Sequence, residues 1–311
     1  MSRKAIRGGS AAVAVWLMGT GLAHAHGIFW VPNWPPVWEP AVRVDPVSAP
    51  GVADGCPIES ADGLSLFIAS ARGGDANNIY VSDRDSTVAP WQTPQLIPDP
   101  ISLQGPADFC PTPVRGRSLM FVSDRGGVGV CNGGVGGDMY ISRQSPAGAW
   151  SAPVHLGCAP DGPNTAGAER SPALVETPYG TFLFYSTNGT TGHQDIHVSV
   201  MRKDGTFGAG KVVESLSTQY EDIMPNVRER EFGGYEIVFS SNRANPTATP
   251  ADQDVYIAFA WFLPGPWTAP VNVGSSINTV PAAEQRSTLS HDGQRLYFGR
   301  AGDIYVSQRR K

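Results

Sequence analysis

One strand-like phrase occurs five times along the chain, and it constrains the fold more than any other feature. It reads NIYVS from Asn78, and its later copies, DMYIS, DIHVS, DVYIA and DIYVS, start at Asp138, Asp195, Asp254 and Asp303. A repeat of about 40–60 residues with several short strands is typical of β-propeller blades. One blade cannot bury both faces of its sheet, so the copies have to pack around a common axis. The sequence therefore predicts an all-β fold, a five-bladed β-propeller.

A second phrase predicts how the ring closes. It contains an aromatic residue and a short outer strand, and four copies start at Trp91, Trp150, Phe207 and Trp267. A fifth copy, WEPAVRV from Trp38, precedes every complete repeat, whereas the last repeat ends without one. Residues 26–46 are therefore expected to supply the outer strand of the last blade, which removes an unpaired sheet edge. Residues 47–311 are expected to form the five-bladed propeller.

The first 25 residues have the pattern of an export signal. Arg3, Lys4 and Arg7 precede an apolar run, and Ala23-His24-Ala25 fits a cleavage site for signal peptidase. A periplasmic or secreted protein is expected, with no membrane-spanning segment after cleavage. The formal net charge is −5, and the signal contains no acidic residue, so the mature chain is more acidic still. This charge argues against nucleic acid as a partner, and a monomer is expected.

Four cysteines in an exported chain indicate two disulfides, for which three pairings are possible. Cys56 and Cys110 occupy the same position in consecutive repeats, in DGCPIE and DFCPTP. Cys131 and Cys158 belong to one repeat. We therefore favour the pairs Cys56–Cys110 and Cys131–Cys158.

The repeats resemble the WD40-like propeller repeats called PD40, which occur in the periplasmic protein TolB and in other exported bacterial proteins. The resemblance rests on SADGLSLFIASAR from Ser60, HDGQRLYFGR from His291 and DIYVS from Asp303, and it covers essentially the whole mature chain. TolB itself differs, because it has an additional N-terminal α/β domain. The resemblance implies a periplasmic binding propeller and identifies no ligand.

An acidic residue begins every expected innermost strand, and in four repeats proline follows three residues later. These five residues, called the ring acids below, are Asp54, Asp108, Glu169, Asp222 and Glu284. Innermost strands line the channel, so the ring acids are expected to form a ligand-binding site at one mouth. No cofactor is assigned, although crowded carboxylates could bind Ca²⁺. The other interpretation, which we favour, is that each acid accepts backbone N–H bonds from its own loop.

Arginines also recur after the second strand of four repeats. They are Arg72, Arg125, Arg243 and Arg300, and Asn188 interrupts the series. They could pair with the ring acids across blades or capture a carboxylate or phosphate.

Three further features have both a structural and a functional interpretation. His193 and His197 could share a strand face and bind zinc, but His197 also fills the aromatic position of its repeat. The segment from Phe29 to Trp38 could bind sugar or peptide through its tryptophans, or fasten the closing strand. The Gly-rich segment 126–138 is expected to be a loop, with calcium binding as the alternative.

The leading functional hypothesis is a non-enzymatic propeller that recognises a protein or a carbohydrate at the channel mouth. The alternative is a propeller enzyme of the glycoside hydrolase or lyase type that uses Glu169, Asp222 and Glu284. An enzyme of this type requires two carboxyl groups at a defined separation beside an open cleft. The geometry of the ring acids therefore distinguishes the two hypotheses.

Overall fold

The computed structural model of the protein describes residues 34–74, 76–127, 130–131, 136–244 and 252–310. The chain divides into two units, Met1–Trp34 and Pro35–Lys311, and the fold described below is that of the second. The expected signal at residues 1–25 and the aromatic segment up to residue 33 lie outside the described residues, as does part of the Gly-rich loop. Among the described residues there is no helix that could cross a membrane.

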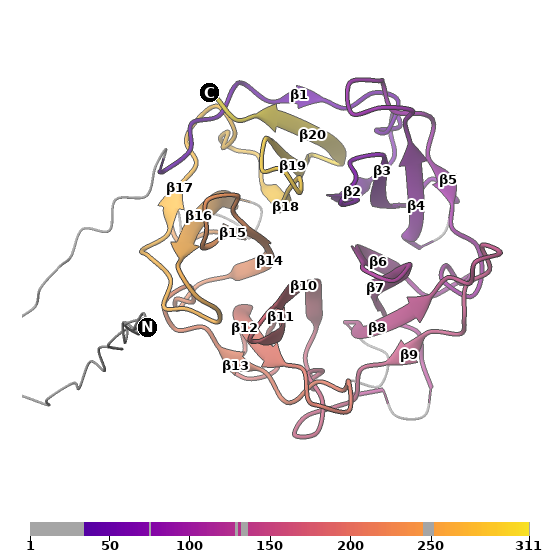
Figure 1. The fold of residues 1–311 in the computed structure, drawn as a ribbon. Coiled ribbons are helices and arrows are strands. Elements are labelled where there is room, and N and C mark those ends of the chain that lie inside the picture. The colour runs from indigo at the N-terminus through magenta and orange to yellow at the C-terminus, as the bar shows by residue number, and fades with distance from the viewer. Residues whose placement is uncertain (1–33, 75, 128–129, 132–135, 245–251, 311) are drawn as a thin grey trace, which may run out of the picture. The chain divides into compact units, whose positions relative to one another are not determined.

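Five four-stranded antiparallel sheets surround a common axis, as predicted (Figure 1). The first blade contains β2 (Asp54–Glu59), β3 (Ser65–Ser70), β4 (Asn78–Asp83) and β5 (Gln95–Leu96). The second contains β6 (Asp108–Val114), β7 (Ser118–Ser123), β8 (Asp138–Arg143) and β9 (Val154–His155). The third contains β10 (Glu169–Thr177), β11 (Gly180–Thr187), β12 (Asp195–Val200) and β13 (Lys211–Val212). The fourth contains β14 (Asp222–Glu229), β15 (Tyr235–Ser241), β16 (Asp254–Ala260) and β17 (Val271–Asn272). The fifth contains β18 (Glu284–Leu289), β19 (Arg295–Arg300), β20 (Asp303–Gln308) and β1 (Val42–Arg43).

The fifth blade confirms the predicted closure, because its outer strand comes from the N-terminal side of the propeller (Figure 1). In β1, Val42 pairs with Val306 and Arg43 with Tyr305 of β20. The Trp38 side chain is 1 % exposed and lies beneath the guanidinium of Arg309, 5.0 Å from its ring centre. The closing segment therefore contributes buried apolar surface as well as backbone hydrogen bonds.

The hydrophobic core lies between neighbouring blades. Between the first two blades, for example, Ile79 and Ile101 pack with Leu119 and Phe121. The second strands are the most buried elements, and every residue of β7 and β15 is buried. The side chain at the aromatic position of the third strand stacks on the second strand. Tyr140, for example, stacks on Phe121 with ring centres 6.0 Å apart. His197 occupies this position in the third blade and is 1 % exposed, so it is a core residue.

A β-bulge interrupts each innermost strand two residues after its ring acid. The bulged residue adopts the left-handed conformation, with φ between 46° and 59°, although none of the five is glycine. Four bulges continue with proline, which has no N–H to donate to the strand ladder. The bulge changes the direction of the strand close to the propeller axis. The bulged residues are Cys56, Cys110, Ser171, Met224 and Arg286.

Candidate functional site

The ring acids begin strands β2, β6, β10, β14 and β18, as the sequence predicted, but their side chains are buried. Asp54 is 4 % exposed and the other four are 0 % exposed. Each accepts a hydrogen bond from a backbone N–H in the loop before its strand. The donors are the N–H groups of Ala49, Leu103, Thr165, Thr218 and Thr279, at 2.7–3.2 Å. The loop-capping interpretation is therefore confirmed, and ligand binding by the ring acids stays a prediction.

Four ring acids also pair with an arginine of the same blade, with N–O distances of 2.5–2.8 Å. The pairs are Asp54–Arg72, Asp108–Arg125, Asp222–Arg243 and Glu284–Arg300. The pairing across blades that the sequence suggested is wrong, because the β-hairpin between the first and second strands brings acid and arginine together within one sheet. Each arginine also donates to a backbone carbonyl of the preceding loop, at Val47, Ile101, Leu216 or Ile277. These arginines therefore fasten the loop to the blade.

The third blade lacks this arginine, and the residue in its place is Gly189. Glu169 pairs with Thr187 as Asp54 pairs with Ser70. In the first, second and fourth blades the arginine follows this partner by two residues, whereas in the fifth blade Arg300 is itself the partner of Glu284. The expectation that Asn188 occupies the arginine position is therefore wrong by one residue. Asn188 instead accepts a hydrogen bond from the N–H of Ala168, as Asn242 does from that of Glu221.

A side chain cannot be accommodated at Gly189. A Cβ atom there would lie 2.0 Å from Oγ1 of Thr165, which occupies the space beside the carboxyl group of Glu169. Thr165 and Thr187 donate their hydroxyl hydrogens to Oε1 of Glu169 at 2.6 and 2.8 Å. Neutral hydroxyl groups thus replace the guanidinium that the other four carboxylates have.

This substitution leaves Glu169 with the most perturbed carboxyl of the ring. Burial raises the pKa of Glu169 to about 8, and the hydrogen bonds from Thr165 and Thr187 offset only part of that effect. Both threonine hydroxyls donate to Oε1, and Oε2 has no hydrogen-bond partner among the described residues. A pKa of about 8 favours the protonated carboxyl group at neutral pH, and Oε2 is the oxygen left to carry the proton.

Two hollows lie at opposite ends of the innermost strands. The mouth pocket, of about 520 Å³, lies where these strands begin and includes Asp54, Phe109, Gln285 and Arg286 in its lining. The hairpin pocket, of about 850 Å³, lies where they end. Its lining includes Asp83, Trp150, Glu176 and Glu229. Both hollows are large enough for a small molecule.

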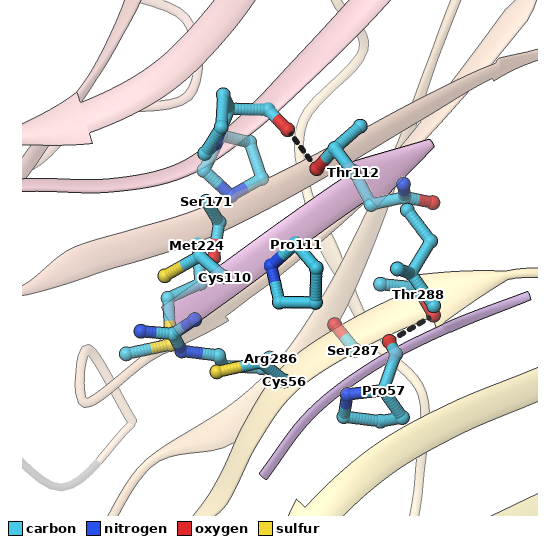
Figure 2. A pocket seen from close by; sticks show the side chains of 14 residues that line it. Cys56, Pro57, Cys110, Pro111, Thr112, Ser171, Met224, Arg286, Ser287 and Thr288 are labelled. Carbon is cyan, nitrogen blue, oxygen red and sulfur yellow. Dashed lines mark hydrogen bonds between the residues drawn. The ribbon is translucent and has the colours of Figure 1, made fainter. Parts of the chain in front are cut away.

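Between these ends lies an axial cavity of about 20 Å³, which is enough for one water molecule. Its walls include the five bulged residues, whose side chains converge on the axis, and Figure 2 shows Arg286 beside the two cysteine sulfurs. Thr112 donates to the carbonyl of Pro172 and Thr288 to that of Pro57, which joins neighbouring blades here. The sequence analysis missed this site. Its signal was the variable residue two positions after each ring acid, namely Cys, Cys, Ser, Met and Arg in the five repeats.

The four cysteines confirm one predicted disulfide and contradict the other. Cys131 and Cys158 are bonded, with Cα atoms 5.5 Å apart. Cys56 and Cys110 are buried free thiols on neighbouring innermost strands. The expected Cys56–Cys110 disulfide is therefore wrong for this structure, since the bulges direct both thiols toward the axis, where Arg286 interacts with them.

One further group of side chains in the described residues has metal-ligand spacing. It consists of Cys131, His155 and Cys158. Both sulfurs belong to the disulfide, and His155 instead lies 3.0 Å from the carboxylate of Asp138. His193 and His197, for which zinc was the alternative, do not belong to such a group.

The solved structures similar to this chain include several glycoside hydrolases. The α-L-arabinofuranosidase of Podospora anserina matches with a TM-score of 0.57 and 13 % identity, over 89 % of this chain and 97 % of that one. The endo-arabinase of Bacteroides thetaiotaomicron matches with a TM-score of 0.53 and 13 % identity, over 87 % and 98 %. A thermostable family-43 glycoside hydrolase has a TM-score of 0.53 and 11 % identity, over 86 % and 92 %. No family model and no curated protein sequence matches the chain.

These comparisons correct two expectations. The resemblance to PD40 repeats is wrong, because no such family model matches and the similar structures are glycoside hydrolases. The hypothesis of a non-enzymatic binding propeller is corrected by the same finding, which agrees better with the alternative of a propeller enzyme. At these identities the likeness establishes the fold. The chain is a five-bladed β-propeller of the architecture on which glycoside hydrolases are built.

Proposed function

We propose that the protein is an exported enzyme that cleaves carbohydrates in the manner of glycoside hydrolases, with Glu169 as the proton donor. The observation that carries the proposal is the state of the Glu169 carboxyl group. Its pKa of about 8 favours the protonated form at neutral pH, and its Oε2 has no partner among the described residues. Glycosidic bonds are cleaved when a carboxylic acid of raised pKa protonates the leaving oxygen.

The similar structures support a carbohydrate substrate that contains arabinose. Those matches include an α-L-arabinofuranosidase and an endo-arabinase, and they extend over almost the whole of those chains. Arabinan and aryl α-L-arabinofuranosides are therefore the first substrates to test.

The mouth pocket is the proposed substrate site. Asp54 lines it, and Glu169 begins its strand at the position in the third blade that Asp54 holds in the first. Phe109 offers an apolar surface, and Gln285 and Arg286 offer hydrogen-bond donors, a combination typical of small-molecule sites. Because Glu169 is fully buried, residues 165–168 have to move before a glycosidic oxygen can reach Oε2.

The test is hydrolysis of arabinan and an aryl α-L-arabinofuranoside by the mature protein. Glu169→Gln is expected to lower kcat by about a hundredfold or more, because the amide cannot donate the required proton. Glu176→Gln is the matched control, since Glu176 lines the hairpin pocket at the other end of the strands, and it should leave kcat unchanged. Equal loss in both variants, or no hydrolysis of any arabinose-containing substrate by the unmodified protein, would contradict the proposal.

Export is the second part of the proposal. The basic and apolar pattern of residues 1–25 supports it, and the Cys131–Cys158 disulfide is of the kind that persists in oxidising compartments. N-terminal sequencing of the protein from the periplasm or the medium should give a chain that starts at His26. Retention of the uncleaved chain in the cytoplasm would argue against export.

A further inference from the structure

The axial cavity brings together two thiols, which the proposed hydrolysis does not use, and the guanidinium of Arg286, which also lines the mouth pocket. Cys56, Cys110 and Arg286 are bulged residues of three different blades, and all three line the cavity (Figure 2). Cys56 and Cys110 are 8 % and 2 % exposed. The two thiols come from neighbouring blades, so the repeat itself places them together.

The positive charge around these thiols has no carboxylate to balance it. Arg286 and Arg170 lie over the ring of Phe109, 5.4 and 5.1 Å from its centre, and neither forms an ion pair with a carboxylate in the described part of the chain. The buried Nη1 of Arg286 has no hydrogen-bond partner there. Both arginines are half-buried, and a thiolate is an anion that can lie beside them.

The pKa values of the two cysteines are shifted in opposite directions. Burial alone would raise the pKa of Cys110, but the hydrogen bond from Cys56 and the charges of Arg286 and Arg170 lower it to about 6. Burial and the hydrogen bond to Cys110 raise the pKa of Cys56 well above its usual value. These opposite shifts favour a thiolate at Cys110 and a neutral thiol at Cys56 near neutral pH.

The size of the cavity limits what can react there. Its volume of about 20 Å³ holds one water-sized molecule. Cys56, Met224 and Arg286 also line the mouth pocket, so a solute that enters the mouth is adjacent to the cavity. Hydrogen peroxide is close to water in size, whereas organic disulfides and aryl hydroperoxides are much larger.

We propose that Cys110 and Cys56 form a peroxide-reactive dithiol on the propeller axis. The thiolate of Cys110 attacks one oxygen of hydrogen peroxide, an S–O bond forms and the O–O bond breaks. Hydroxide leaves and takes a proton to become water, and Cys110 becomes a sulfenic acid. Cys56 then loses its proton and attacks the sulfur of Cys110, so that the S–S bond forms while the S–O bond breaks and a second water leaves. Two thiols are oxidised by one peroxide, which is reduced to two waters.

Arg286 acts in the first of these steps. Its guanidinium stabilises the thiolate before the attack and the negative charge of the departing hydroxide during it. The product is a disulfide between β2 and β6, which is absent from the reduced structure. Peroxide oxidation would thus join the first two blades covalently at the axis.

The test treats the reduced mature protein with a small excess of hydrogen peroxide at pH 7, followed by alkylation and peptide mass spectrometry. The expected result is a Cys56–Cys110 cross-linked peptide. Cys56→Ser should instead accumulate a sulfenic acid at Cys110, which dimedone captures. Cys110→Ser should leave Cys56 unoxidised over the same period.

Two comparisons test the roles of charge and size. Arg286→Gln should slow oxidation about tenfold or more. Arg286→Lys, which keeps the charge, should slow oxidation less. Ser171→Ala is the matched control from the same cavity, and it should react as the unmodified protein does. Glutathione disulfide and cumene hydroperoxide at equal concentration should react at least about tenfold more slowly than hydrogen peroxide.

Three outcomes would overturn the proposal. They are a rate at Cys110 equal to that of a free cysteine in solution, no effect of Arg286→Gln, and equal rates with the bulky oxidants. Because hydrolysis of arabinosides is measured separately, failure of the dithiol proposal leaves the proposed function untouched.

Discussion

The third blade and the other four stabilise the buried ring acid in two different ways. In every blade, a ring acid at the start of the innermost strand accepts an N–H bond from the preceding loop. Four blades balance the carboxylate with an arginine, whereas Glu169 has two threonine hydroxyls and a raised pKa that favours its protonated form. The comparison shows that loop capping requires only an acceptor oxygen at this position. Whether an arginine lies beside that group decides how its charge is balanced.

The sharpest test of this difference removes the charge from one acid of each kind. Asp222→Asn should lower the free energy of unfolding by up to about 3–5 kcal/mol, because the largely buried guanidinium of Arg243 is left beside a neutral amide. Glu169→Gln should cost less than about 1 kcal/mol at pH 5, since it replaces one neutral group with another. Urea unfolding followed by tryptophan fluorescence measures both values.

A double variant serves as the control. Asp222→Asn combined with Arg243→Met removes both charges and should recover part of the lost stability. Equal costs for the two single variants would show that Glu169 is ionised in the folded protein, and the comparison would fail.

The pH dependence of stability should also separate Glu169 from the other ring acids. Its pKa is about 8 in the folded state, and the ordinary value of the unfolded chain is 4.5. Between these values the unfolded chain is ionised and the folded protein is not, so stability falls as pH rises. The contribution of this group is up to about 1.4 kcal/mol per pH unit, and it is constant below and above the window.

The measurement is urea unfolding at pH 5, 6, 7 and 8 for the unmodified protein and for Glu169→Gln. The difference between the two proteins should change steadily across this range in favour of the variant at high pH. Parallel curves would mean that Glu169 titrates at an ordinary value.

A smaller effect is expected from the hydroxyl groups that replace the arginine. Thr187→Val should cost about 1–2 kcal/mol, because it removes a buried hydrogen bond to Oε1 of Glu169 while keeping the shape of the side chain. It should also raise the pKa of Glu169 further, since that hydrogen bond lowers it. Thr187→Ser keeps the hydroxyl and should cost less than half as much, as thermal unfolding would show.

The smallest effect is expected from metal removal. Four ring acids already have a guanidinium as their cation and the fifth is neutral, so a chelator should leave Tm unchanged. A bound Ca²⁺ at a hundredfold excess over its Kd would stabilise the protein by about 2.7 kcal/mol, which calorimetry detects easily. A fall in Tm with chelator, abolished by Asp222→Asn, would show that the ring binds a cation.

The sequence was sufficient to predict the propeller because its repeated phrases describe strands. The aromatic position at Tyr140 and the closing strand after Trp38 follow from the positions of these phrases, and both are present. The same phrases misidentified the family. DIYVS describes a strand of a propeller blade, and such a pattern is shared by propellers that are otherwise unrelated.

The candidate site could be predicted only in part, because it depends on one-residue shifts in the alignment of the repeats and in the pairing of the strands. The ring acids were identified correctly, but Asn188 was aligned with the arginines although Gly189 occupies their position. The axial site was missed because β-bulges turn Cys56 and Arg286 toward the axis, and alternation along a strand does not predict a bulge. Cys56 and Cys110 are free thiols that interact with Arg286 from a distant repeat, an arrangement that their positions in the sequence do not show.

The five bulges have a consequence for how this fold can acquire new chemistry. The backbone holds one conformation at five equivalent places, although their side chains differ in size, polarity and charge. That conformation costs a non-glycine residue about 1 kcal/mol, and the flanking acid, loop and strand ladder impose it whichever side chain is present. Replacement of an axial side chain therefore changes the reactivity at the centre of the molecule while the blades and their packing stay as they are. Evolution or protein design can thus vary five converging positions on this axis independently of the architecture that supports them.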